Sequence, residues 1–168
     1  MREALPIRAR RLLRQAANLQ VIADELRINP ANKGRTGRTI EKLLGLSGTD
    51  NGIEPDWYGV EVKGFPVSAV TADGAIPIAA DKIFVCSSTQ NPIAKLEQVL
   101  FVFFDYQTKD IRDIRKMSLM PELRHRLHMD VARAAPKSGA ELLFLNRKGT
   151  GYAWYLREDF LIQCEVWD

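Results

Sequence analysis

The order of strand-like and helix-like patterns in this sequence predicts an α/β fold. Residues 58–67 alternate apolar and charged side chains as a strand does, and residues 82–88 contain a short apolar run. Residues 98–105 (QVLFVFFD) form the most apolar run of the chain, which is typical of a central buried strand. Helical periodicity precedes and follows these runs. A chain of 168 residues fits one domain with a core of its own.

The composition is that of an ordinary soluble protein, with 46% hydrophobic and 27% charged residues. A net charge of +3 permits a polyanionic partner without requiring one. We see no apolar run long enough for a membrane span and no signal-peptide pattern at Met1, so we expect a cytoplasmic protein without membrane contact. The two cysteines are too few for a disulfide scaffold, and Cys86 is expected to be a buried thiol.

Two helical patterns flank the predicted strands. Residues 7–26 carry an apolar stripe, and arginines crowd their first half, either on a solvated face or in contact with phosphate. Residues 119–135 predict a second helix that begins at Pro121, a favourable first-turn residue. On this helix His125 and His128 have the spacing of a metal-binding pair, but a solvated helix face is the preferred interpretation because no third ligand is nearby. Residues 108–116 are charged and are expected at the surface.

A basic turn, residues 32–38 (NKGRTGR), precedes a short helical pattern that holds Glu41. Helix N-termini attract anions, so this turn suits a phosphate, with an ordinary basic loop as the alternative. It is not a Walker loop, because the Gly-Lys-Ser/Thr ending is absent.

The predicted strand at 58–67 carries the chemistry. Glu61 and Lys63 alternate with Val60 and Val62, and we expect both charged side chains to point together, away from the apolar face. Asp56 lies just upstream in a turn-rich stretch. A pair of charges on a solvated strand, without function, is the alternative.

These residue types suit the hydrolysis of a phosphodiester. Magnesium prefers hard oxygen ligands, which Asp56, Glu61 and the carbonyl of Val62 would supply, while Glu41 would extend the acidic cluster. Lys63 would orient the attacking water or stabilise the charge that builds on the phosphate. The sequence therefore predicts a metal-dependent phosphodiesterase.

Two further segments contain basic residues of interest. Lys95 precedes the most apolar run and either reaches the metal site as a phosphate clamp or lies on the surface. Residues 146–151 (NRKGTG) read as a flexible basic loop before an aromatic stretch, residues 152–155. Such a loop can enter a groove of DNA, and the alternative is a hairpin with core aromatics.

The chain resembles the MutH family, which comprises mismatch-repair endonucleases and their restriction-enzyme relatives within the PD-(D/E)xK nuclease superfamily. The matching residues up to the motif are Lys33, Gly34, Gly37, Glu41, Leu44, Gly45, Asp56, residues 59–63 (GVEVK), Pro66 and Val67. Further matches are Gly74, Pro77, residues 84–86, Lys95, Leu96, Val99, Leu100, Tyr155, Leu156 and Phe160. The resemblance extends from about residue 33 to residue 160 and is dense up to about residue 100.

The resemblance implies a restriction-endonuclease-like fold, in which strands 58–67, 82–88 and 98–105 form a central mixed sheet flanked by helices. It implies one nuclease domain, with a helical arm at about 1–31, a catalytic core at about 32–106 and a DNA-contacting part at about 107–168. The implied activity is hydrolysis of double-stranded DNA at a short recognition sequence with Mg²⁺, for which Mn²⁺ can substitute. The implied catalytic residues are Glu41, Asp56, Glu61 and Lys63. Lys33 and Lys95 would grip the DNA backbone, and Arg147 and Tyr155 would contact bases.

Three functional forms remain open. One is a repair nickase that a mismatch-repair activator protein switches on, and another is a stand-alone type II restriction enzyme that cuts both strands. Four residues separate Asp56 from Glu61, which is tighter than in mismatch-repair members and similar to monomeric restriction enzymes. The third form is a DNA-binding module that has lost catalysis, against which the intact acidic cluster and lysine argue.

Overall fold

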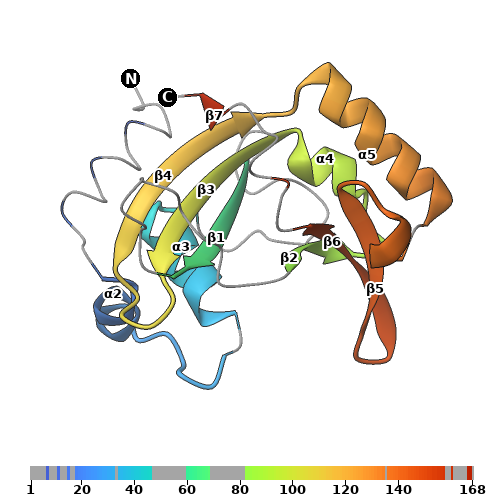
Figure 1. The fold of residues 1–168 in the computed structure, drawn as a ribbon. Helices are drawn as coiled ribbons and strands as arrows, with labels where there is room; N and C mark the ends of the chain where they lie inside the picture. Colours follow the sequence, from blue (N-terminus) through green and yellow to red (C-terminus); the bar gives the residue numbers. More distant parts are fainter. Residues whose placement is uncertain are drawn as a thin grey trace.

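The protein folds into two β-sheets with helices against them (Figure 1). The computed structural model describes residues 7, 11, 15, 18–32, 34–46, 60–68, 82–134, 136–157 and 160, and the backbone of 166–167. The elements in chain order are α2 (Leu19–Glu25), α3 (Arg35–Leu43), β1 (Glu61–Val67), β2 (Lys82–Ser87), α4 (Pro92–Leu96), β3 (Gln98–Asp105), β4 (Ile111–Ser118), α5 (Pro121–Arg133), the 3-10 helix η1 (Lys137–Gly139), β5 (Leu143–Lys148), β6 (Gly151–Arg157) and β7 (Val166–Trp167). This arrangement confirms the α/β class.

The first sheet has the strand order β1-β3-β4-β7. β1 runs parallel to β3, with Glu61 opposite Val99, whereas β4 runs antiparallel to β3. All of β3 except Gln98 is buried, which confirms the prediction of a central buried strand. The parallel pair is connected through β2 and α4, because parallel neighbours need a long crossover.

The second sheet has the order β2-β6-β5 and is antiparallel throughout. The expectation that residues 82–88 join the strands at 58–67 and 98–105 in one sheet is therefore wrong. An apolar run reveals burial but not its pairing partner, and here the hairpin β5–β6 supplies a full-length antiparallel neighbour. The pairing contains an irregularity between Phe84 and Cys86, and Phe84 is 40% exposed although it lies in an apolar run.

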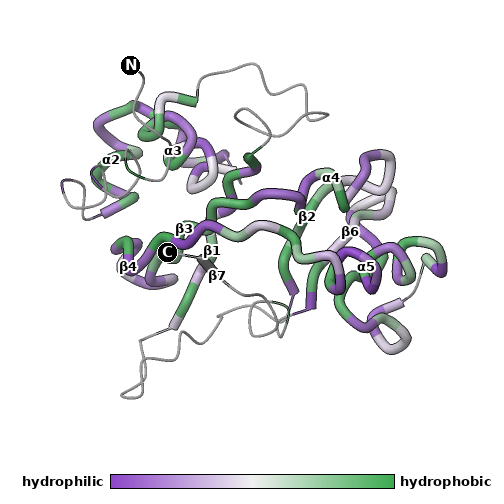
Figure 2. Tube along the Cα trace, turned by 90° about the horizontal axis from the view of Figure 1, so that it is seen from above, coloured by the Kyte–Doolittle hydropathy of each residue, from purple (hydrophilic) through white to green (hydrophobic). Residues whose placement is uncertain are grey.

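Two hydrophobic clusters cover the two faces of β1 and β3. The larger lies between the two sheets and includes Phe65, Val67 and residues of α4 and α5. The smaller includes Val60, Val62 and residues of α2 and α3. Figure 2 shows α2 and α3 together on one side of the first sheet. Both faces of β1 are therefore covered by packed side chains.

Two other expectations are corrected and one is refined. Most of residues 108–116 belong to β4, and all of them except Ile114 are at least partly exposed, as expected. The long N-terminal helix is interrupted at Asn18, whose backbone is extended and forms a β-bridge to Asp110. Its side-chain oxygen caps α2 by accepting hydrogen bonds from the backbone N–H groups of Gln20 and Val21. Residues 146–151 are mostly the ends of β5 and β6 rather than a loop. No helix in the described parts of the chain has both the length and the apolar character needed to cross a membrane.

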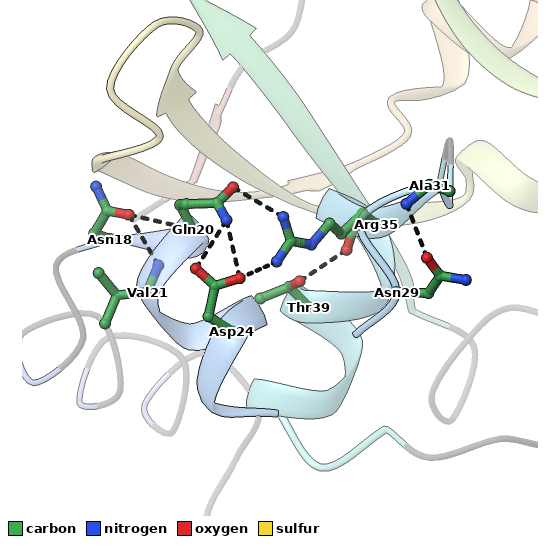
Figure 3. A network of polar contacts seen from close by, with 8 residues as sticks. All are labelled: Asn18, Gln20, Val21, Asp24, Asn29, Ala31, Arg35 and Thr39. Carbon is green, nitrogen blue, oxygen red and sulfur yellow. Dashed lines mark hydrogen bonds and ion pairs between the residues drawn. The ribbon is translucent and has the colours of Figure 1, made fainter. Parts of the chain in front are cut away.

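A polar network fastens α2 to α3 (Figure 3). The guanidinium of Arg35 on α3 forms an ion pair with Asp24 of α2 and donates to Gln20 at 3.1 Å. Gln20 in turn donates to both carboxylate oxygens of Asp24, at 3.1 and 3.0 Å. The hydrogen bonds from Gln20 and Arg35 hold the pKa of Asp24 below its ordinary value. This network therefore holds α3, the helix that carries Glu41, against α2.

Two carboxylates at the turn between β3 and β4 make the stability of the fold depend on pH. Backbone N–H groups of Thr108 and Gln107 lower the pKa of Asp105, and the Thr108 hydroxyl and Asn18 amide lower that of Asp110. Carboxylates with lowered pKa values stabilise the fold above the unfolded value of 3.8, and that stability is lost as pH falls through the folded values. We expect the free energy of unfolding, measured with urea, to fall less steeply with decreasing pH below about pH 4 in Asp110→Asn than in the wild type. Identical pH profiles would contradict this.

Candidate functional site

Glu61 lies at the centre of a buried cluster of charges. Its Oε1 accepts a hydrogen bond from Lys63 Nζ at 2.8 Å, and its Oε2 accepts one from Lys95 Nζ at 3.0 Å. The side chains of Glu61 and Lys95 are 7% and 6% exposed, and that of Lys63 is 15% exposed. Lys63 Nζ also donates to the carbonyl oxygen of Val85 on β2 at 3.0 Å. The cluster therefore joins β1, α4 and the second sheet.

Alternation along β1 brings Glu61 and Lys63 to one face, as the sequence predicts. The alternative of a solvated charged strand is wrong, and so is the expectation that the pair points away from apolar side chains. Phe65 and Val67 follow on the same alternation and pack in the cluster between the sheets, so the charged pair points into the interior. The sequence pattern misleads because β1, paired in parallel with β3, is covered on both faces.

Lys95 reaches Glu61 from a short helix. Asn91 caps α4 by accepting hydrogen bonds from the backbone N–H groups of Ile93 and Ala94, and Pro92 occupies the first turn. Ile93 and Leu96 anchor the helix in the core. Lys95 contacts Glu61, and its interpretation as a surface lysine is wrong. Its reach to a metal ion stays a prediction. Contact of Lys95 with the DNA backbone stays a prediction.

Glu41 lies on α3, as predicted, and α3 packs through Ile40 in the cluster that contains Val62. Gly64 permits this close packing, because a Cβ at Gly64 would lie 2.9 Å from Ile40 Cδ1. Since Val62 and Glu61 alternate along β1, α3 covers the face opposite to the one on which Glu61 lies. A joint acidic cluster of Glu41 and Glu61 stays a prediction.

The remaining predicted metal ligands are only partly visible. Asp56 and Lys33 lie outside the described residues. The Val62 side chain is buried in the core, and a metal-binding role of its carbonyl stays a prediction. Within the described parts of the chain, no three His, Cys, Asp or Glu residues gather in a way that would hold a metal ion.

The predicted base-contacting residues differ from each other in exposure. Arg147 is exposed on β5, opposite the 56% exposed Tyr152 of β6. Tyr155 is only 8% exposed, and its ring packs against Phe144 and Phe84 at centroid distances of 5.8 Å each. The alternative of a hairpin with core aromatics describes Tyr155 correctly, and it leaves little of this ring for contact with a base.

Two groups next to Glu61 and Lys63 complete the site, and only the second has a signal in the sequence. The Val85 carbonyl binds Lys63, and a backbone acceptor gives no side-chain signal. Burial raises the pKa of the neighbouring Cys86 thiol to about 11, although the charges of Lys63 and Lys95 act in the other direction. Cys86 therefore stays a protonated core thiol at neutral pH, as expected from its position in an apolar run.

No family model matches the chain, and no curated protein matches it. The chemistry of the site must therefore be argued from its own residues. A carboxylate fixed between two ammonium groups in the interior concentrates both signs of charge where water is largely excluded. With two lysines and one carboxylate, such a site can hold an anion, whereas a cation there would need at least one further carboxylate.

Proposed function

We propose that the protein is a magnesium-dependent endonuclease that hydrolyses phosphodiester bonds of double-stranded DNA, with a restriction-endonuclease-like core. The observation that supports this proposal is the Lys63–Glu61–Lys95 cluster, in which one buried carboxylate contacts two lysines from separate elements. Its acid and first lysine come from the strand motif that resembles the nuclease superfamily, and the second lysine comes from a segment that resembles it independently.

The burial of this cluster favours a function over a merely structural role. Desolvating three charged groups is expensive, and buried ion pairs contribute little net stability compared with apolar side chains of similar volume. Buried, closely coupled charges are typical of catalytic sites. On a solvated strand without function, the side chains of Glu61 and Lys63 would be exposed to water, whereas here they are 7% and 15% exposed.

The donor type suits magnesium, because Glu61 supplies hard carboxylate oxygens. Each of these oxygens accepts a hydrogen bond from a lysine, so a second carboxylate, Asp56, would be needed to offset the excess positive charge of the cluster. Glu61 and Asp56 would hold the ion, with the Val62 carbonyl and Glu41 as further oxygen donors. When bound, magnesium or manganese neutralises charge on the phosphate and lowers the pKa of a bound water.

The lysines have separate roles in this proposal. Lys63 is held by both Glu61 and the Val85 carbonyl, which fixes its ammonium group at the side of the carboxylate. There it stabilises the negative charge that builds on the phosphate oxygens. Lys95 donates to the other oxygen of Glu61 and so orients the carboxylate, and it contributes a second positive charge toward the DNA backbone.

The test is cleavage of supercoiled plasmid with magnesium. We expect the wild type to cut, and Asp56→Ala and Lys63→Ala to cut at least about 100-fold more slowly. Lys109→Gln, at the distant β3–β4 turn, is the control and should cut at the wild-type rate. Open-circle product would indicate the nickase form, and linear product the restriction form.

A wild type that is inert with magnesium and manganese on both methylated and unmethylated plasmid would contradict unaided cleavage. Recovery of cutting with a mismatch-repair activator would then support the partner-dependent nickase. DNA binding without cutting under every condition would identify a binding module instead.

A further inference from the structure

Three aromatic rings form a row across the outer face of the second sheet. Phe84 of β2 pairs with Tyr155 of β6, which pairs with Phe144 of β5. The rings of Phe84 and Tyr155 meet edge to face, and those of Tyr155 and Phe144 stack at an interplanar angle of 23°. Phe144 and Tyr155 belong to a small cluster that is separate from the core between the sheets.

A lysine ammonium group lies over each of the three rings. Lys148 Nζ is 3.6 Å from the centroid of Phe84, and Lys82 Nζ is 5.2 Å from that of Tyr155. Lys137 Nζ, from η1, is 5.9 Å from the centroid of Phe144. Distances within about 6 Å are those of cation–π contacts. We call these three lysines with their three rings the lysine–aromatic face.

This part of the molecule is strongly basic. The strands β2, β5 and β6 together contain Lys82, Arg147, Lys148 and Arg157 and no acidic residue. Lys137 of η1 adds a further positive charge. The rings hold the lysine ammonium groups in place, which reduces the entropy lost when those groups bind a ligand.

We propose that the lysine–aromatic face binds the phosphate backbone of duplex DNA, and the choice of duplex DNA rests on the proposed function. Phosphates rather than bases are the ligand at two of the rings, because Phe144 is fully buried and Tyr155 is 8% exposed. The third ring, Phe84, is 40% exposed, but Lys148 Nζ lies over it at 3.6 Å. Ammonium groups that lie over aromatic rings bind negative charge and cannot stack on bases. Tyr155 is therefore a positioning residue for Lys82 rather than a residue that reads sequence.

The position of this face suits a substrate that also enters the candidate site. Val85, whose carbonyl accepts the hydrogen bond from Lys63, directly follows Phe84 in β2. β2 is an edge strand of the second sheet, so the candidate site meets its edge and the lysine–aromatic face begins on its outer surface. The hairpin β5–β6 extends this surface away from the first sheet (Figure 1). A duplex at the site would pass beside the lysines.

The experiment measures binding of a labelled duplex of arbitrary sequence in EDTA, over a series of salt concentrations, so that no cleavage is needed. The variant is Lys82→Gln/Lys137→Gln/Lys148→Gln. Each lost phosphate contact lowers the slope of log K against log salt by about 0.9, so we expect the slope to fall by roughly 2 to 3. The affinity loss should be equal for unrelated duplex sequences, because phosphate contacts carry no sequence information.

Lys109→Gln is the matched control, because Lys109 Nζ also lies over two rings, Phe104 at 5.6 Å and Tyr106 at 5.7 Å, but at the distant β3–β4 turn. It should leave the slope unchanged, and the triple Lys→Arg variant should restore most of the wild-type slope. If the triple Gln variant does not fold, Lys148→Gln alone tests the proposal, with an expected fall of about 0.9.

An unchanged slope in the folded Gln variant, an equal fall in Lys109→Gln, or a loss of binding to single strands only would overturn the inference. The two proposals fail separately. Lysine-dependent duplex binding without any plasmid cleavage would leave the inference standing and remove the proposed nuclease. Asp56-dependent cleavage with lysine-independent binding would do the reverse.

Discussion

Asp130→Ala is expected to lower the free energy of unfolding by at least about 3 kcal/mol. The Asp130 side chain on α5 is 1% exposed, and its Oδ1 accepts a hydrogen bond from the Glu141 backbone N–H at 3.0 Å. Its Oδ2 accepts from the N–H groups of Leu142 and Leu143, at 2.8 and 2.9 Å. Alanine would leave all three donors without this acceptor. A buried donor without a partner costs about 1 to 3 kcal/mol.

Urea unfolding at neutral pH measures this loss. Asp130→Asn should lie between the wild type and Asp130→Ala, because its single amide oxygen can still accept from one or two of the N–H groups. His128→Ala, an exposed change on the same helix, should stay within about 0.5 kcal/mol of the wild type. A small effect of Asp130→Ala, comparable to that of His128→Ala, would show that water replaces the carboxylate.

The consequence of this contact extends beyond stability. Asp130 ties the last turn of α5 to the segment that begins β5, and β5 carries both Phe144 and Lys148 of the lysine–aromatic face. We therefore expect Asp130→Ala to weaken duplex binding as well, measured in EDTA with the salt slope as the readout. A local loosening of the hairpin would lower this slope while the first sheet stays folded.

Asp130 also shows where sequence reasoning stops. On a helical wheel it is one more polar residue, and its partners are backbone groups 11 to 13 residues further along the chain. Periodicity predicted β3, the helix that begins at Pro121 and the common face of Glu61 and Lys63, because these depend on neighbours within a few residues. The pairing of β2 with β6 depends on distant segments, and no local pattern encodes it.

In the candidate site, too, local sequence predicts some features, whereas others depend on distant segments. Alternation placed Glu61 and Lys63 together, but burial of their shared face follows from α4 and the second sheet, which lie elsewhere in the sequence. Lys95 was associated with the site through the resemblance as well as through its basic side chain. Its burial is explained by Asn91 and Pro92, which start a short helix that points Lys95 inward. The sequence contains the capping residues of this helix, but it does not show that Lys95 points toward Glu61.

Glu61→Gln is expected to lower the free energy of unfolding by about 3 kcal/mol, independently of any effect on DNA cleavage. The substitution keeps the shape of the side chain but removes the negative charge between Lys63 and Lys95. The two ammonium groups would then repel each other in the interior, with only a neutral amide between them. Breaking a buried ion pair is far more destabilising than replacing the whole pair by apolar groups, because an uncompensated buried charge remains.

A double-mutant cycle isolates this effect. Lys95→Met keeps the apolar stem of the side chain, and in combination with Glu61→Gln it removes one of the two uncompensated charges. The double variant should therefore be more stable than the sum of the single losses predicts, by at least about 1.5 kcal/mol. The exposed pair Asp113–Arg115, with side chains 40% and 41% exposed, is the control, and Asp113→Asn should cost less than about 1 kcal/mol.

The size of the coupling energy between Glu61 and Lys95 distinguishes two roles of the lysines. Strong coupling would mean that Lys63 and Lys95 hold Glu61 in a fixed orientation before any substrate binds, which is the preorganisation that a hydrolytic site requires. Strictly additive losses would contradict the ion cluster as an energetic unit, even if both contacts exist. Glu61 would then be oriented by the packing of β1 alone, and Lys95 would be left with contact to the DNA backbone as its proposed role.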